Sequence, residues 1–76
     1  MRFTGLSSFI SFISILNKGG YTPLFDINDI RKIFKTNKIV ISKLVCDIVY
    51  IDDNILINFY NVYGVCVIKF TLKRGV

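Results

Sequence analysis

The chain has 76 residues, of which 53% are hydrophobic, and its ten lysines and arginines outnumber five aspartates to give a formal net charge of +5. This length accommodates one small domain, residues 1–76, and no second module. With no histidine, no glutamate and only two separated cysteines, the chain makes a transition-metal site improbable, and the same absences remove most routes to nucleophilic or acid–base catalysis. We therefore expect a protein that is not an enzyme and that holds no metal or cofactor.

An amphipathic helix is predicted to begin near Leu6 and to end at the Gly19-Gly20 pair. Its serines fall on one side, and apolar residues recur at helical spacing on the other: Leu6, Phe9, Ile10, Ile13 and Leu16. Phe12 and Ile15 widen this apolar stripe, so a helix lying on a membrane is an alternative to a core helix. The segment is too short to cross a bilayer, and we expect no membrane span.

A short extended segment and a second helix are predicted next. Residues 21–25 are β-prone but are interrupted by Pro23, which suits an edge strand. Asp26 is placed to cap a helix, and Asp29 lies in its first turn, where the helix dipole favours an acid. The expected apolar stripe is Ile27, Ile30, Ile33 and Phe34. The opposite side carries the densest basic cluster of the chain, Arg31, Lys32 and Lys35. Basic residues late in a helix also complement its dipole, which accounts for Lys35 better than for the whole cluster.

Residues 38–50 form a β-branched run that predicts either one bent strand or two short strands separated at Ser42-Lys43. Residues 51–54 contain two aspartates and an asparagine, which favour a turn because their side chains bond local backbone and tolerate left-handed conformations. A calcium loop is the alternative, but the acids lack its spacing and its terminal glutamate. For Cys46 and Cys66 we expect buried, reduced thiols rather than a disulfide.

The clearest signal is a β-hairpin over residues 55–72, in which two alternating runs flank Tyr63-Gly64. In the second run the apolar face comprises Cys66, Ile68, Phe70 and Leu72, and the polar face comprises Lys69, Thr71 and Lys73. In the first run one face comprises Ile55, Ile57 and Phe59. The order helix, strand, helix, strand, strand, strand predicts an α+β domain of two layers, with two helices on one face of a small, mainly antiparallel sheet.

The positive charge favours a polyanionic partner, with nucleic acid ahead of a membrane surface; the alternative is a basic surface that is merely solvated. Isoleucine, asparagine, lysine, phenylalanine and tyrosine are abundant, and these residues have AT-rich codons. The composition therefore hints at the AT-rich genome of an organelle, a phage or a bacterium.

Two segments resemble the N-terminal domain of the ribosomal protein S8 family of the small subunit. Residues 27–40, INDIRKIFKTNKIV, are similar to the second helix of that family and the strand after it, with Asn37-Lys38 in place of a Glu-Gly pair. Residues 55–75 resemble its hairpin. The matching positions there are Phe59-Tyr60 for a Leu-Lys-Tyr region, Gly64 for the turn, Val67-Ile68 for a Val-Ile pair, and Leu72-Lys73-Arg74 for an Ile-Lys-Arg. The first helix departs from the family, having Ser11, Phe12 and Ser14 where it has arginines.

This resemblance implies a structural rRNA-binding protein of the small ribosomal subunit, in a truncated or split version without the family's C-terminal domain. Its partners would be ribosomal RNA and neighbouring ribosomal proteins, and the missing domain would be dispensable, replaced, or supplied by a separate chain. The composition places it in the mitochondrial matrix or on another organelle's ribosome, and otherwise in the cytoplasm. In this role the expected phosphate contacts are Arg31, Lys32, Lys35, Lys69, Lys73 and Arg74. Tyr60 or Tyr63 could stack on a base, although cross-strand packing is the commoner role.

Two other functions stay open. A small phage or accessory protein that binds and inhibits a protein partner would use an exposed sheet edge or the first helix. A peripheral membrane protein would use the first helix, with Arg2 and Lys18 as anchors. RNA binding should weaken steeply with salt, whereas an apolar protein interface should not.

Overall fold

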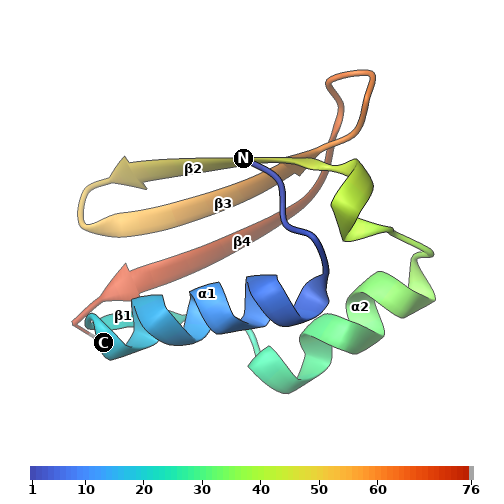
Figure 1. Ribbon diagram of the computed structural model, residues 1–76. Helices are drawn as coiled ribbons and strands as arrows, with labels where there is room; N and C mark the ends of the chain where they lie inside the picture. Colours follow the sequence, from blue (N-terminus) through green and yellow to red (C-terminus); the bar gives the residue numbers. More distant parts are fainter. Residues whose placement is uncertain (76) are drawn as a thin grey trace.

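The computed structural model describes residues 1–75 and has two layers, an antiparallel sheet and a helical layer on one of its faces (Figure 1). The elements in chain order are α1 (Leu6–Lys18), β1 (Tyr21–Pro23), the 3-10 turn η1 (Ile27–Asp29), α2 (Ile30–Thr36), the 3-10 turn η2 (Ile41–Lys43), β2 (Val45–Ile51), β3 (Asn54–Tyr60) and β4 (Cys66–Arg74). The strands lie in the order β1-β4-β3-β2. The α+β class and the two layers are therefore confirmed.

The central strand β3 shows why the sheet has one dry face. Ile55, Ile57 and Phe59 alternate along it and are fully buried. Their cross-strand partners on β4 are Leu72, Phe70 and Ile68. Because side chains alternate between the two faces of a strand, these rows all point to the helices. The residues between them point to the other face, which none of the helices within residues 1–75 covers and which we call the bare face.

Aromatic rings fill the space between the two layers. Phe9 of α1 meets Phe59 with ring centroids 5.1 Å apart and Phe70 with centroids 5.2 Å apart. Phe34 of α2 stands edge-on to Phe59 at 6.0 Å. Edge-to-face aromatic pairs add to the free energy of burial, so this cluster is the main link between helices and sheet.

The residues before α1 also belong to the core. Phe3 is buried and lies 5.6 Å from Phe12, measured between ring centroids. The carbonyl of Met1 accepts a hydrogen bond of 2.7 Å from the Cys46 N–H, so the N-terminal arm covers the start of the β2 edge. Phe12 is thus used inside the protein, and Ile15 is the apolar residue of α1 that stays exposed.

The prediction that a strand begins at Lys38 is wrong, because β2 begins at Val45. Helix α2 ends in a Schellman motif, in which the Ile39 N–H donates to Phe34 O and the Lys38 N–H donates to Lys35 O. Lys38 takes a left-handed conformation with φ of 53° and turns the chain back toward the sheet. Of the β-branched residues that follow, Ile41 lies in the 3-10 turn η2 and is buried there, so it does not belong to a strand.

Two smaller expectations also change. Asp26 does act as a cap, accepting a hydrogen bond from the Asn28 N–H, but it starts η1, so α2 is short and begins only at Ile30. An irregularity in the β3–β4 pairing places Cys66 opposite Tyr60. Cys66 therefore leaves the alternation of Ile68, Phe70 and Leu72 and is only half-buried.

Candidate nucleic-acid interface

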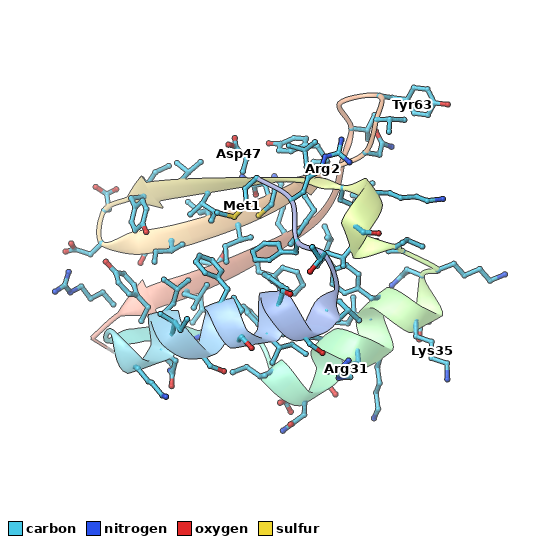
Figure 2. All side chains as sticks on the ribbon, viewed as in Figure 1. Met1, Arg2, Arg31, Lys35, Asp47 and Tyr63 are labelled. Carbon is cyan, nitrogen blue, oxygen red and sulfur yellow. The ribbon has the colours of Figure 1, made fainter. Side chains whose placement is uncertain are left out.

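The three cations predicted on the second helix do lie together on its exposed side. Burial of Ile30 and Phe34 against the core leaves Arg31, Lys32 and Lys35 in solvent. Figure 2 shows Arg31 and Lys35 on the helical side of the molecule, on the side away from Asp47. The Arg31 guanidinium donates a hydrogen bond of 3.3 Å to the Ser7 hydroxyl at the start of α1, which links the two helices.

The structure extends this cluster with cations that the sequence reasoning missed. Lys38 follows α2 directly, and Lys43 ends η2; both are exposed. The Arg2 guanidinium reaches η2 as well, donating a long hydrogen bond of 3.5 Å to the Ser42 carbonyl. We call these six residues the basic edge: Arg2, Arg31, Lys32, Lys35, Lys38 and Lys43.

The basic edge has no acid within it. No aspartate lies between Asp29 and Asp47 in the sequence. Within residues 1–75 no ion pair neutralises any of its cations. This acid-free run was visible in the sequence, but assigning residues 38–50 to strand separated Lys38 and Lys43 from the helical cluster. Unpaired, exposed cations on one edge produce a positive potential that attracts a polyanion.

The other predicted cations are not brought to the basic edge. Lys69 pairs across strands with Asn58, and Asn58 pairs with Asp47, so this row lies on the bare face. The Oδ1 atom of Asn58 is buried there and accepts no hydrogen bond. Lys69 therefore lies on the face opposite to α2, in the same cross-strand row as Asp47.

Lys73 and Arg74 lie at the far end of β4. Lys73 pairs with Asn54, next to the turn that holds Asp52 and Asp53. The Arg74 N–H donates to the Asp53 carbonyl, and its guanidinium lies over the Tyr21 ring, 5.6 Å from the centroid. The nearby aspartates offset these charges, so this end of the sheet is a weaker site for a polyanion.

The two tyrosines of the hairpin have different surroundings. Tyr60 is half-buried and sits between Val45 of β2 and Cys66 of β4, which is the cross-strand packing expected of it. Tyr63 lies at the hairpin tip and is 85% exposed. Of the two rings, that of Tyr63 is the more accessible to another molecule.

Both cysteines are free, and Cys46 is buried. Burial raises the pKa of the Cys46 thiol to about 11, with Asp47 acting in the same direction and the N-terminal amino group opposing both. Among residues 1–75 no three histidine, cysteine or acidic side chains are grouped so as to hold a metal ion, and no pocket is present. None of the helices in this part of the chain is long and apolar enough to cross a membrane.

No protein-family model, curated protein or solved structure matches the chain.

Proposed function

We propose that the protein is a structural RNA-binding protein of the small ribosomal subunit, in mitochondria or another organelle, and that the basic edge is its rRNA-binding surface. The observation that supports this proposal is the run of exposed cations from Arg31 to Lys43, which contains no acid and no ion pair. Phosphate is the ligand that such a surface fits best, because several cations can each neutralise one charge of the same strand.

Binding would proceed by charge neutralisation on a rigid base. Phe34 and Ile41 are buried and hold α2 and η2 on the core, so the cations between them have fixed attachment points. Each lysine or arginine that meets a phosphate releases condensed counterions, which stabilises the complex and makes it sensitive to salt. Such contacts set the position of a protein on RNA but do not read base sequence.

Two surfaces suit the protein partners of this proposal, which are neighbouring ribosomal proteins. One is the bare face, where Val49 and Leu56 are cross-strand neighbours and half-buried. The other is the outer edge of β2. The bare face could be covered without hiding the basic edge, since α2 lies on the opposite face of the sheet.

Co-sedimentation of the native protein tests the proposal. At moderate salt we expect it to sediment with the small ribosomal subunit, and at high salt we expect it to be released from rRNA and from the particle in part or in full. A protein that runs free, or with one protein partner, at both salt concentrations would contradict the ribosomal function.

A second candidate is a small accessory or phage protein that inhibits a partner by adding to its sheet. The observation in its favour is the β2 edge. Since the Cys46 N–H points outward to Met1, the backbone groups of Ile48 and Tyr50 also point outward by alternation. Tyr50 and Ile51 are 66% and 50% exposed along the same edge. A complex formed through this edge would survive high salt, which separates it from RNA binding.

A further inference from the structure

The hairpin tip, residues 61–65, holds an aromatic ring in solvent. Tyr63 is 85% exposed, and the valines beside it, Val62 and Val65, are 75% and 56% exposed. Among residues 1–75 the Tyr63 ring has no ring contact or hydrogen bond from its hydroxyl. Figure 1 shows the tip projecting beyond the sheet at the end where η2 lies. The ring therefore contributes little to folding and is available to a partner.

The tip is nevertheless held by four hydrogen bonds of its own. The Asn61 Oδ1 atom accepts hydrogen bonds from the Tyr63 N–H at 2.9 Å and from the Val65 N–H at 3.0 Å. The Asn61 carbonyl accepts a third from the Gly64 N–H, and Val65 O accepts a fourth from the Asn61 N–H. Gly64 has φ of 77°, a conformation that glycine adopts without strain. Because the loop is ordered in advance, a ligand that meets the Tyr63 ring loses little conformational entropy of the loop.

Two cations lie on or at the η2 segment, which leads into the strand that pairs with the base of this tip. Tyr60, which leads into the loop, pairs with Val45, and Val45 follows the η2 segment that ends in Lys43. Arg2 is held at η2 by its bond to the Ser42 carbonyl. The hairpin from residue 54 to residue 75 contains no acid. A partner of the tip would thus meet an aromatic ring and positive charge together.

We propose that Tyr63 is a base-stacking residue, whose ring stacks on an unpaired base of the RNA that the basic edge holds by its phosphates. The inference rests on the RNA binding proposed above and adds its substrate class, RNA with a loop or a single-stranded segment. RNA satisfies both features of the tip, because it offers aromatic faces to the ring and phosphates to Arg2 and Lys43. A protein partner would need a pocket with apolar walls for the Tyr63 ring and acidic side chains for Arg2 and Lys43.

The chemistry of the loop also predicts little preference among bases. The Asn61 oxygen is used inside the loop, and its neighbours Val62 and Val65 cannot form hydrogen bonds with a base edge through their side chains. Stacking needs only an aromatic face, which every base has. Through the Tyr63 ring, the site would therefore select unpaired bases over paired ones with little dependence on their identity.

Tyr63→Trp gives a direct test, because the protein contains no tryptophan and the new indole would be the only one. The probes are an RNA stem-loop and a duplex made by extending the same stem through the loop. At low salt we expect the stem-loop to quench the fluorescence of the new indole in a saturable titration, and the duplex to leave it unchanged. An indole that responds to neither RNA, or equally to both, would overturn the stacking.

Affinity measurements with Tyr63→Ala and Tyr63→Phe complete the test. Loss of the ring should weaken stem-loop binding by roughly 5- to 100-fold and leave duplex binding unchanged, whereas Tyr63→Phe should bind as the unchanged protein does. Tyr50→Ala is the matched control, since Tyr50 is also an exposed tyrosine but lies on β2 near the opposite end of the sheet. The melting temperature of Tyr63→Ala should not change, because the ring packs on nothing.

The outcomes separate the two proposals. If Tyr63→Ala binds the stem-loop normally while replacement of Lys35 or Lys38 weakens binding, the stacking is wrong and the basic edge stands. If the unchanged protein binds neither RNA at low salt, RNA binding and stacking both fail. Equal losses for stem-loop and duplex would also overturn the stacking, because they would make Tyr63 a general backbone contact.

Discussion

Adjacent residues on β4 have opposite roles. Phe70 is 4% exposed and lies 4.7 Å from Phe25 between ring centroids, whereas Lys69 points to the bare face. We predict that Phe70→Asp abolishes cooperative folding, because an unpaired buried charge costs several kcal/mol, which is comparable with the roughly 5 kcal/mol that stabilises a small domain. Lys69→Asp is the matched control and should unfold within a few degrees of the unchanged protein. Thermal unfolding followed by circular dichroism measures both, and a cooperative transition in Phe70→Asp would contradict the assigned faces.

The two cysteines also differ as single residues. Cys46 is buried, and burial raises its thiol pKa to about 11, so at pH 8 roughly one molecule in a thousand carries the reactive thiolate. Cys66 is only half-buried. With a thiol reagent at pH 8 we predict one fast label on the folded protein and two labels after denaturation. Cys66→Ser should remove the fast label; fast labelling that persists in this variant would mean that Cys46 is accessible.

At the scale of elements, helix α2 ends at a lysine in a left-handed conformation, which glycine adopts with less strain. Lys38 occupies the left-handed position of the Schellman motif, where glycine is usual because a side chain there costs about 1 kcal/mol. The same lysine that carries this backbone strain also supplies a cation to the basic edge. We predict that Lys38→Gly raises the free energy of unfolding by about 1 kcal/mol and weakens RNA binding.

Chemical denaturation and RNA affinity, measured on the same preparation, test this trade-off. Lys38→Arg is the control for charge, because it keeps the cation and the strain, and it should change neither property. If Lys38→Gly were more stable and bound RNA as before, Lys38 would be a residue of the helix end alone. If it were less stable, the Schellman geometry assigned to Lys38 would be wrong.

Elements with a local cause were predictable from the sequence, and elements with a distant cause were not. The Gly19-Gly20 stop and the turn at Asp52-Asp53, where φ is 49° and 64°, follow from the residues themselves. The late start of β2 follows instead from the burial of Ile41 in η2. No local sequence pattern distinguishes this buried 3-10 turn from a buried strand. The pairing of β1 with β4 and the bond from Cys46 to Met1 join segments far apart in the chain. A period-two pattern carries no information on such partners.

At the scale of the whole molecule, the two layers divide the cations into separate sets. Sequence patterning correctly put Arg31, Lys32 and Lys35 on one exposed helix side. It could not show that Lys69 would face away from them, because the relation between a helix and a strand face depends on which side of the sheet the helix packs. The same packing brings Arg2 to η2 from the other end of the chain. The cations behind the net charge of +5 are thus distributed unevenly: six lie on the basic edge, and Lys69, Lys73 and Arg74 lie elsewhere, near aspartates.

This division predicts how salt acts on variants. Each cation that meets a phosphate adds about 0.7 to 0.9 to the slope of log affinity against log salt concentration. Lys35→Gln and Lys38→Gln, each on the basic edge, should lower that slope by about this amount and weaken binding to stem-loop and duplex alike. Lys73→Gln removes the same formal charge beside Asp52 and Asp53 and is the matched control, for which we expect the slope to stay the same.

Binding titrations of a single duplex RNA across a series of salt concentrations give all three slopes. Equal changes in the three variants would mean that net charge attracts the RNA and that the arrangement of cations on one edge does not matter. A change in Lys73→Gln alone would move the interface to the far end of β4, where Arg74 lies over Tyr21.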